Sequence, residues 1–505
     1  MPITATRSNR VDDFLARSAA RTPDRTALTF TDRTWTYREL DDAVSRGAAD
    51  LLSRGLHDGD RVATYGTNSD AYVIAYLACS RAGLVHVPIN YMLTGDELAY
   101  LIADSGAALV LADEALRPRA AELELTAVAA LRDGDGAFLD RVRTGDVPEP
   151  PIAPDTGLVQ LLYTSGTTSA PKGAMMTHRA LTHEYYSCIT AFSMTAQDTP
   201  LHAMPLYHSA GMHVWMMPYL AVGATNHLME APEVGKVLEQ LEARKAGAIF
   251  LAPTVWVPLS QHPDFATRDL SALRKAVYGA SIMPVPVLER LSQALPGLGF
   301  YNAFGQSEIG PLATVLAPEE HADRPASCGR AVLNVELKVV DPDGQPVSGD
   351  QPGEVLYRSP QLCEGYWNKP EATAEAFDGG WFHSGDLVTI DDEGYITVVD
   401  RIKDVVNTGG VLVASREVED ALYTHPGVGE VAVIGVPDEK WIEAIAAFVV
   451  LADGAAVTAD ELIAYTKQRL APFKVPKAVH LVAELPRNAS GKLLKRVLRD
   501  DVPAG

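Results

Sequence analysis

Residues 158–178 combine the features of a phosphate-binding loop. The segment reads LVQLLYTSGTTSAPKGAMMTH, an apolar stretch followed by hydroxyl and glycine residues and then by Pro171, Lys172 and Gly173. In such a loop, backbone N–H groups and hydroxyls can converge on a polyphosphate, and the lysine adds a positive charge. The loop is not of the Walker A type, because Gly173 rather than Ser or Thr follows Lys172. By itself the pattern leaves an ordinary polar turn open as well as a nucleotide site.

Four more polar segments follow this loop along the chain. They are residues 302–308 (NAFGQSE), residues 381–387 (WFHSGDL), residues 401–410, which begin with RIKD and end with two glycines, and residues 486–492 (PRNASGK). In type and order the five segments resemble the motifs of the adenylate-forming superfamily, which includes acyl-CoA synthetases, luciferases and the adenylation domains of peptide synthetases. The resemblance extends from about residue 11 to about residue 496, so it covers nearly the whole chain.

The resemblance implies that the chain activates a carboxylic acid with ATP and Mg²⁺, forming an acyl-AMP, and then transfers the acyl group to coenzyme A with release of AMP. Carboxylate and α-phosphate repel each other until cations screen them, and the motifs supply such groups. By resemblance, Ser307 contacts the α-phosphate and Glu308 helps to hold Mg²⁺, a hard cation that prefers oxygen ligands. The residues expected to close over the β- and γ-phosphates are Thr164, Ser165, Gly166, Thr167, Thr168 and Lys172.

The same resemblance assigns residues to the nucleoside. Phe304 is expected to lie against the adenine ring, although a purely structural core role for it stays open. Asp386 and Arg401 suit the two ribose hydroxyls, because a carboxylate accepts and a guanidinium donates hydrogen bonds. The remaining residues expected at the nucleotide are Gly279, Ala280, Ser281, Asn302 and Gly305.

The C-terminal motifs imply a two-step reaction with a moving domain. Lys492 is expected to bridge the substrate carboxylate and the α-phosphate during adenylation. Rotation about a hinge at Lys403 would then withdraw this lysine and bring Gly409 and Gly410 to the active site, where a thiol attacks the acyl carbonyl. The residues expected to contact coenzyme A are Gly409, Gly410, Trp441, Phe473 and Lys474, and for Trp441 a packing role stays open.

An apolar acyl pocket is expected around the segment that follows residue 205. By resemblance, His208 lies at the gate of this pocket, or else is a core histidine. The further residues assigned to the pocket are Met212, Val214, Trp215, Val255 and Ala303. Because no arginine stands among these positions to receive a second carboxylate, a hydrophobic monocarboxylic acid is favoured over a dicarboxylic acid.

Three departures from the family pattern leave alternatives open. The family commonly continues its glycine pair with Glu or Phe and then Asn-Val-Tyr-Pro, where this chain has residues 411–415 (VLVAS). Ile442 replaces a glycine after Trp441, and Ser169 replaces a glycine in the first loop. One alternative is therefore a ligase that mainly converts a preformed acyl adenylate from a partner enzyme or loads a carrier-protein thiol. A non-catalytic nucleotide-binding protein is a further alternative, disfavoured by the presence of Lys492 and Glu308.

Alternating helical and β-rich segments must position these motifs. Helices are predicted over residues 11–21, 37–54 and 71–82, and strands over residues 61–65, 85–88 and 108–112. This alternation predicts an α/β fold with a largely parallel sheet. Residues 332–399 are strand-rich with D-P-D-G and D-D-E-G turns, which predicts a small antiparallel β subdomain. We expect a large N-terminal domain over residues 1–400 and a small mobile α+β C-terminal domain over residues 401–505.

Composition limits the class of protein further. The chain has 505 residues and a net charge of −22, which argues against binding to nucleic acids or anionic membranes. No apolar run reaches the length of a membrane span, and no apolar leader precedes residue 14. The four scattered cysteines suit reduced thiols in a cytoplasmic enzyme, expected as a monomer or homodimer. Residues 401–505 carry 13 Lys and Arg against 14 Asp and Glu, so nearly all the negative charge lies on the first 400 residues.

Overall fold

The computed structural model describes residues 9–149, 157–164, 170–279, 283, 285–408, 411–438, 441–452, 454–487 and 493–501. The chain forms two compact units. The first comprises Met1–Ser165, Pro171–Glu336 and Tyr357–Phe382, and the second comprises Gly166–Ala170, Leu337–Leu356 and His383–Gly505. This division differs from a cut at residue 401, because most of the small β subdomain groups with the C-terminal residues. The hinge and the domain boundary at residue 401 stay predictions.

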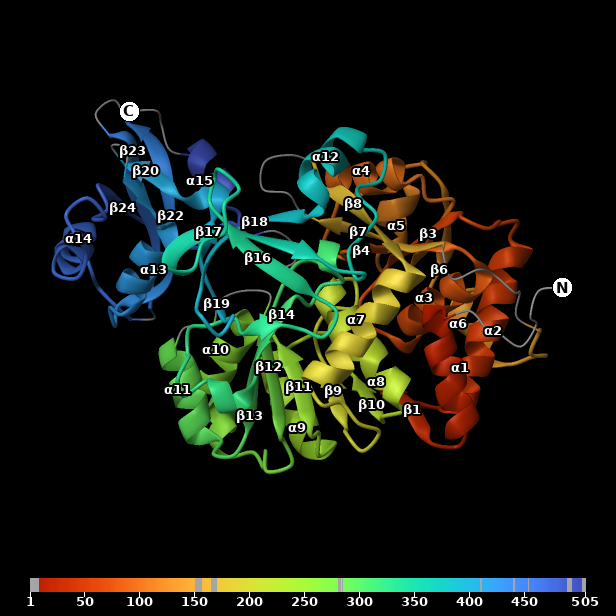
Figure 1. The fold of residues 1–505 in the computed structure, drawn as a ribbon. Coiled ribbons are helices and arrows are strands. Elements are labelled where there is room, and N and C mark those ends of the chain that lie inside the picture. Colours follow the sequence, from red (N-terminus) through yellow and green to blue (C-terminus); the bar gives the residue numbers. More distant parts are fainter. Residues whose placement is uncertain are drawn as a thin grey trace. The chain divides into compact units, whose positions relative to one another are not determined.

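The first unit contains a six-stranded sheet with the strand order β6-β5-β3-β4-β7-β8 (Figure 1). Neighbouring strands run parallel from β6 to β7, while β7 and β8 form an antiparallel hairpin. The strands are β3 (Arg61–Tyr65), β4 (Val85–Ile89), β5 (Leu109–Ala112), β6 (Ala127–Ala130), β7 (Leu158–Thr164) and β8 (Lys172–Thr177). The helices of this part of the chain are α1 (Val11–Arg21), α2 (Tyr37–Ser53), α3 (Asp70–Ala82), α4 (Gly95–Ser105), α5 (Arg117–Ala121) and α6 (Phe138–Arg143).

A nine-stranded sheet follows in the same unit, with the order β15-β14-β13-β12-β11-β9-β10-β1-β2. Its strands are β1 (Thr26–Phe30), β2 (Arg33–Thr36), β9 (Pro200–His202), β10 (Asn226–Leu228), β11 (Ala248–Leu251), β12 (Lys275–Gly279), β13 (Gly299–Phe304), β14 (Thr314–Leu316) and β15 (Arg330–Ala331). The helices are α7 (His178–Ala191), α8 (Met217–Val222), α9 (Val234–Ala243), α10 (Pro253–Gln261), α11 (Val285–Ala294) and α12 (Pro370–Ala376). Shorter turns are the π-helix η1 (Ala210–Met216) and the 3₁₀ turns η2 (Pro263–Ala266), η3 (Ser307–Ile309), η4 (Pro318–Glu320) and η5 (Asp378–Gly380).

The cores of the first unit explain why these segments fold as they do. Every residue of α3 is buried, in keeping with its nearly continuous apolar sequence, and Ser69 caps its first turn by accepting from Tyr72 N–H. Helix α2 instead has one apolar face, and Thr36 and Glu39 form a capping box at its start. Burial of both helices in one core fixes the sheet whose β7–β8 hairpin carries the phosphate loop.

The small four-stranded sheet, with the order β16-β17-β18-β19, belongs mostly to the second unit. Its strands are β16 (Glu336–Val340), β17 (Gly349–Arg358), β18 (Phe382–Ile390) and β19 (Ile396–Arg401). Both predicted turns form, with Gly344 N–H donating to Asp341 O and Gly394 N–H donating to Asp391 O. Each of these glycines has a positive φ, the conformation for which glycine is favoured.

The rest of the second unit is a sheet with the order β21-β20-β23-β22, to which β24 adds alongside β23. Its strands are β20 (Val406–Thr408), β21 (Val411–Val413), β22 (Val428–Asp438), β23 (Ile442–Leu451) and β24 (Ala478–Leu481). The helical elements are η6 (Ile402–Asp404), α13 (Ser415–Tyr423), α14 (Ala459–Lys467) and α15 (Lys495–Asp501).

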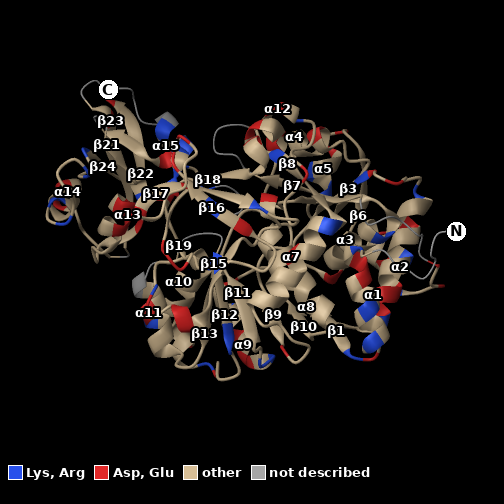
Figure 2. Cartoon of the chain, viewed as in Figure 1, with Lys and Arg blue, Asp and Glu red and all other residues tan. Residues whose placement is uncertain are grey.

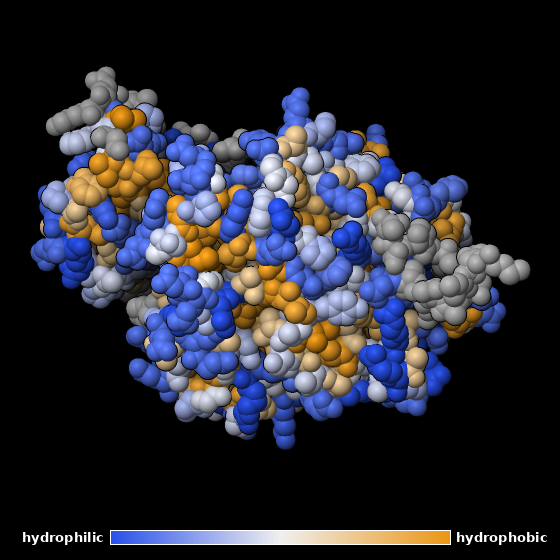
Figure 3. Space-filling view, viewed as in Figure 1, coloured by the Kyte–Doolittle hydropathy of each residue, from blue (hydrophilic) through white to orange (hydrophobic). Residues whose placement is uncertain are grey.

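The predicted α/β class is confirmed, and the predicted helices and strands of the first 112 residues match the observed ones to within about two residues, the usual uncertainty of helix ends. Helices α1 and α2 each carry both acidic and basic residues (Figure 2). The face in Figure 3 is mostly hydrophilic, with apolar groups in scattered places. Among the described residues, no helix has both the length and the apolar character needed to cross a membrane.

Candidate active site

The β7–β8 hairpin brings the two ends of the phosphate loop together. Thr164, the last residue of β7, is the register partner of Lys172, the first residue of β8. The loop residues Ser165, Gly166, Thr167, Thr168 and Ser169 lie outside the described residues. The hairpin therefore holds the described ends of the loop at the edge of the six-stranded sheet, as a loop that encloses phosphates requires.

Glu308 is held at this hairpin by two hydroxyl groups. Its Oε1 atom accepts from Thr164 Oγ1 at 3.2 Å and from the Tyr366 hydroxyl at 3.0 Å. Burial, and next the Glu308 charge, raise the pKa of Tyr366, so its hydroxyl stays protonated and donates. The backbone of Glu308 is fixed as well, because its carbonyl oxygen accepts from Cys363 N–H at 2.8 Å. A carboxylate predicted to hold Mg²⁺ and a residue at the edge of the phosphate loop are thus in direct contact.

Sequence analysis missed Tyr366, which stands 58 residues after Glu308. The Lys172 ammonium lies 5.1 Å from the centre of the Tyr366 ring, a distance suitable for a cation–π contact. Tyr366 therefore connects the lysine of the loop with the carboxylate. No spacing pattern in the chain signals this contact, because it depends on how the segment after β17 returns to the hairpin.

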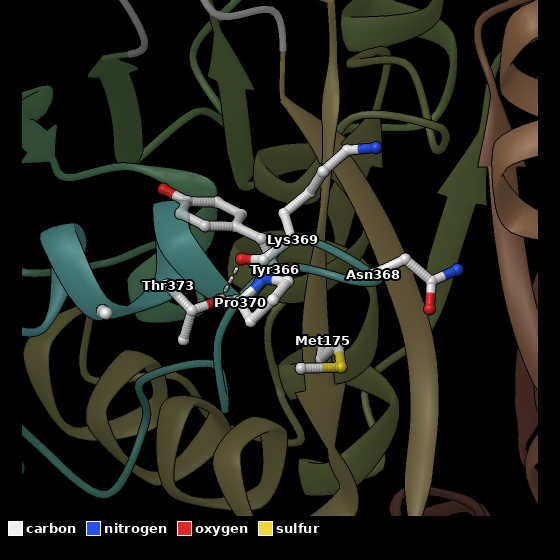
Figure 4. A pocket seen from close by; sticks show the side chains of 7 residues that line it. Met175, Tyr366, Asn368, Lys369, Pro370 and Thr373 are labelled. Atoms are coloured by element: carbon white, nitrogen blue, oxygen red, sulfur yellow. Dashed lines mark hydrogen bonds between the residues drawn. The ribbon is translucent and has the colours of Figure 1, made fainter.

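A hollow of about 460 Å³ lies beside Tyr366. It is lined by Met175, Tyr366, Asn368, Lys369, Pro370, Thr373 and Ala374. In Figure 4 the Tyr366 hydroxyl and the Lys369 ammonium point away from each other, and Thr373 donates to the Lys369 carbonyl. None of the predicted acyl-pocket residues lines this hollow, so it is a separate feature of the surface near the loop.

Three of the predicted acyl-pocket residues lie on one element. Met212, Val214 and Trp215 all lie on η1 and are buried. His208 precedes η1, and its Nδ1 accepts from Ala210 N–H at 3.1 Å. The intervening Ser209 lies with its Oγ 2.9 Å from that of Ser307. The segment that opens with the predicted gate residue therefore contacts the residue predicted at the α-phosphate. The remaining two positions lie on other elements, Val255 on α10 and Ala303 on β13.

The predicted adenine segments are packed so closely that glycine is required. A Cβ atom on Gly279 would lie 2.2 Å from the Ala303 carbonyl oxygen, and one on Gly305 would lie 2.1 Å from that of Pro311. Gly305 also has φ +152°. Asn302 donates to the Ser327 carbonyl at 2.9 Å, which gives it a structural role in β13. Ala280 and Ser281 lie outside the described residues, and Phe304 is partly exposed at the end of β13.

In the second unit, Asp386 and Arg401 form an ion pair across the register of β18 and β19. Asp386 Oδ1 lies 2.5 Å from Arg401 Nε, and the carboxylate is buried while the guanidinium is partly exposed. The apolar context of both residues favoured a role at the ribose over a structural ion pair, and the structure contains this ion pair. The pair fixes the two side chains relative to each other, and the carboxylate retains further lone pairs for hydroxyl donors.

The predicted hinge is bridged by hydrogen bonds between residues on its two sides. Asp400 Oδ2 accepts from the backbone N–H of Ser415 at 2.6 Å and from its Oγ at 2.8 Å. Lys495 Nζ donates in turn to Ser415 Oγ at 2.6 Å and pairs with Glu419 at 2.8 Å. Ser415 stands where the family commonly has proline, which has no N–H to donate. Lys403, the predicted hinge residue, lies in η6, and Gly409, Gly410 and Lys492 lie outside the described residues.

Three described residues that are predicted to contact coenzyme A, Trp441, Phe473 and Lys474, lie in the second unit. Lys474 Nζ lies 2.6 Å from both carboxylate oxygens of Glu417, and Phe473 is exposed beside it. Trp441 packs its ring under the Lys477 ammonium at 5.3 Å. Ile442, at the position of the family glycine, has φ +69° and an exposed side chain. A β-branched residue in this left-handed region is strained.

Comparison with known proteins agrees with this arrangement of segments. Residues 15–367 match the family of AMP-binding enzymes, and residues 417–492 match the AMP-binding enzyme C-terminal domain. A feruloyl-CoA synthase of Amycolatopsis sp is 38% identical over 500 residues, which are 98% of this chain and 99% of that protein. An indoleacetate–CoA ligase of Aromatoleum aromaticum is 31% identical, with 97% of each chain covered.

The fold is similar to that of solved enzymes of the same kind. The crystal structure of an anthranilate CoA ligase in complex with anthranoyl-AMP superposes with a TM-score of 0.91 at 26% identity, covering 98% of this chain and 97% of that one. Similarity of sequence and fold over nearly the full length, together with both family domains in order, leaves one conclusion. The chain belongs to the AMP-binding enzyme family of the adenylate-forming superfamily and is an AMP-forming acid–thiol ligase.

Proposed function

We propose that this acyl-CoA ligase activates a hydrophobic aromatic monocarboxylic acid as its adenylate and passes the acyl group to coenzyme A. The contact of Glu308 with Thr164 and Tyr366 carries the catalytic part of the proposal, because it joins a carboxylate to the edge of the phosphate loop. The substrate class is supported by the names of three relatives, whose acids, ferulate, indoleacetate and anthranilate, each contain an aromatic ring. Other relatives are named as long-chain-fatty-acid–CoA ligases, so the acid panel includes fatty acids.

In the first half-reaction, the carboxylate of the acid attacks the α-phosphorus of ATP and pyrophosphate leaves. Lys172 and the loop after Thr164 hold the β- and γ-phosphates, and Ser307 donates to the α-phosphate. Lys492 bridges the attacking carboxylate and the α-phosphate, which removes their repulsion. Asp386 and Arg401 orient the ribose, and Phe304 lies on the adenine ring.

The residues at Glu308 fit a magnesium ion. Among the described residues both hydrogen bonds to this carboxylate fall on Oε1, so Oε2 keeps lone pairs for a cation. No group of three or more His, Cys, Asp or Glu side chains in the described part of the chain could form a complete metal site. A single carboxylate suits Mg²⁺, which is commonly held by one or two carboxylates together with substrate phosphates. When bound, Mg²⁺ would neutralise charge on the leaving pyrophosphate.

In the second half-reaction, the thiol of coenzyme A attacks the acyl carbonyl and AMP leaves. Rotation at Lys403 removes Lys492 and presents Gly409 and Gly410, where the absence of side chains admits the pantetheine arm. Trp441, Phe473 and Lys474 contact the cofactor. The alternative of an enzyme restricted to one half-reaction or to a carrier protein is not favoured. Three full-length relatives are named as CoA ligases or synthases, whereas one is named as a fatty acid–acyl-carrier-protein ligase.

The experiment is a two-step assay of the purified enzyme with ATP, Mg²⁺ and a panel of acids. The panel contains ferulate, indoleacetate, anthranilate, octanoate, palmitate and malonate. Pyrophosphate exchange reports adenylation, and mass spectrometry after addition of coenzyme A reports the thioester. We expect exchange and CoA ester with at least one aromatic acid and the weakest exchange with malonate. Preference for palmitate or malonate would contradict the substrate class, and CoA ester only from supplied acyl-AMP would contradict the complete reaction.

We propose a cytoplasmic location and a monomeric or homodimeric state. Cys79, Cys188 and Cys363 are buried free thiols, as suits a reducing compartment. Light scattering and fractionation of cells test the two proposals, and recovery of the enzyme outside the cytoplasm would contradict the first.

A further inference from the structure

The side chain of Gln160 joins two histidines inside the first unit. Gln160 lies on β7, the strand that leads into the phosphate loop, and is buried. Its Nε2 donates to Nδ1 of His86 at 3.0 Å, and its Oε1 accepts from Nε2 of His213 at 2.6 Å. His86 is its register partner on β4, and His213 lies on η1. One amide group thus connects the strand of the phosphate loop to the element that carries three predicted acyl-pocket residues.

The orientation of the Gln160 amide sets the directions of the hydrogen bonds around it. Because His86 Nδ1 accepts, its Nε2 carries the proton and donates to Thr64 Oγ1 at 3.0 Å. Because His213 Nε2 donates, its Nδ1 accepts from the Tyr185 hydroxyl at 3.0 Å. Burial lowers the pKa of both histidines to about 3, so both rings are neutral at physiological pH. With the amide in this orientation, both histidines are fully hydrogen-bonded.

The histidines are also enclosed by tyrosine rings. Tyr185 stacks on His213 with 6.0 Å between ring centres and 17° between planes. Tyr76 lies edge-on to His86 at 5.3 Å and to His213 at 5.7 Å, and its hydroxyl is 3.2 Å from that of Tyr185. The position of the His213 ring is therefore determined by α3, α7 and β7 together.

His213 lies in the middle of a π-helix, a rare conformation that is frequent at functional sites. On the chain, Met212 precedes His213 and Val214 follows it. Close to the start of the same element, Gly211 has no space for a side chain, since a Cβ would lie 2.3 Å from the Pro205 carbonyl oxygen. The π-helix is thus fixed by backbone contact near Gly211 and by the two hydrogen bonds of His213 in its middle.

We propose that His213 is a positioning residue that determines which acids the enzyme accepts. Through Gln160 and Tyr185 it holds η1 in one place, so that Met212, Val214 and Trp215 present a pocket wall of one shape. The inference rests on the proposed function, because it takes these three residues as part of the acyl pocket. His213 uses both ring nitrogens in these bonds and acts on the substrate only through its neighbours on η1.

The experiment compares acid selectivity in folded full-length variants. Tyr185→Phe removes one donor to His213 without changing the ring, and His213→Phe removes both bonds. Tyr37→Phe is the matched control, because Tyr37 is equally buried and its hydroxyl donates to the Ala224 carbonyl at 2.6 Å. For each enzyme, pyrophosphate exchange gives kcat/KM for ferulate, anthranilate and octanoate, and the ratios between acids are compared. These ratios do not depend on the folded fraction.

We expect Tyr185→Phe to change the ferulate-to-octanoate ratio by about fivefold, as the loss of one buried hydrogen bond allows, mainly through KM for the acid. His213→Phe should change it further, and Tyr37→Phe should leave it at the wild-type value. If the wild type is active but Tyr185→Phe leaves the ferulate-to-octanoate ratio unchanged, the inference is wrong and the proposed function stands. The same conclusion follows if Tyr37→Phe shifts the ratio as strongly as Tyr185→Phe does. A wild type that adenylates none of the three acids would overturn the proposed function, and the inference with it.

Discussion

The region around Glu308 and Gln160 in the first unit differs in kind from the region around Ile442 in the second. In the first, Glu308, Gln160 and His213 each make at least two hydrogen bonds with partners from other elements. In the second, β21 leaves Val411 and Leu412 45% and 69% exposed, and Ile442 is 59% exposed in a strained conformation. Fixed groups suit chemistry on phosphates, whereas exposed apolar groups suit a surface that is covered during only part of a reaction cycle.

If the two regions serve different half-reactions, a single substitution should slow one half-reaction and leave the other intact. Lys492→Ala should give the largest such difference. Without this charge, adenylation should fall by about 10²- to 10³-fold, because a group that acts only at the developing charge is lost. Transfer from supplied acyl-AMP to coenzyme A should be largely intact, since the proposed rotation withdraws the lysine in that step. Pyrophosphate exchange and thioester formation measure the two rates. The exposed Lys467, replaced by alanine, is the control, and equal loss of both rates in Lys492→Ala would contradict the division.

The hydrogen bonds across the predicted hinge provide the next largest effect. Ser415→Pro restores the common family residue but removes both bonds to Asp400. Each bond to a carboxylate contributes about 1.5–3 kcal/mol. Without them, the segment between Asp400 and Ser415 should unfold locally much more often. Limited trypsin digestion at Arg401 and Lys403 should therefore be at least about tenfold faster. Thr424→Ala, which loses an exposed bond to Ala421, should digest at the wild-type rate. Unchanged digestion of Ser415→Pro would show that these bonds do not restrain the hinge.

Tyr366→Phe tests whether fixed hydrogen bonds matter at Glu308. The loss of one of its two bonds should raise the Mg²⁺ concentration needed for half-maximal exchange and lower the rate by about tenfold, the value of one bond to a charged acceptor. Tyr163→Phe is the matched control, because Tyr163 donates to another carboxylate, that of Asp104, at 2.8 Å. If both variants show the same Mg²⁺ dependence, Tyr366 does not position Glu308.

The contrast between the regions also explains what the sequence could predict. Contiguous patterns were sufficient for α1 and β3, because periodicity is a local property. Tyr366 and Gln160 were missed because their roles depend on partners 58 and 53 residues away, at Glu308 and His213. Such contacts are set by the order of strands in a sheet, which a single sequence does not state.

The pairing of Asp386 with Arg401 was missed for a related reason. Each residue was assigned to the ribose by resemblance, but their pairing follows from the register of β18 and β19. Most of the small sheet lies in the same compact unit as the C-terminal residues, which no local motif in the sequence indicates. Local motifs therefore identify chemistry, while the partners that fix each group come from the fold.

Buried neutral histidines should make the first unit sensitive to acid. Burial lowers the pKa of His86, His202 and His213 to about 3, from 6.5 in an unfolded chain. Below pH 6.5 the unfolded state binds more protons, so stability should fall as the pH falls, by about 1.4 kcal/mol per pH unit for each histidine, until about pH 3. His202→Gln should reduce the change in the free energy of unfolding by about 1.4 kcal/mol per pH unit, measured by denaturant unfolding between pH 6 and 4.5. An unchanged slope would contradict a neutral buried His202.

Ile442→Gly should give the smallest effect, and one of opposite sign. At φ +69° glycine is free of the strain that isoleucine carries, and this relief should raise the free energy of unfolding by about 1 kcal/mol. The greater backbone entropy of glycine in the unfolded chain reduces that gain. Val411→Gly, in an extended strand of the same sheet, should be less stable. Thermal unfolding measures both. If Ile442→Gly is also destabilised, the exposed side chain contributes packing that outweighs its strain. If it is stabilised but transfers the acyl group to coenzyme A more slowly, the isoleucine is retained for that step at a cost in stability.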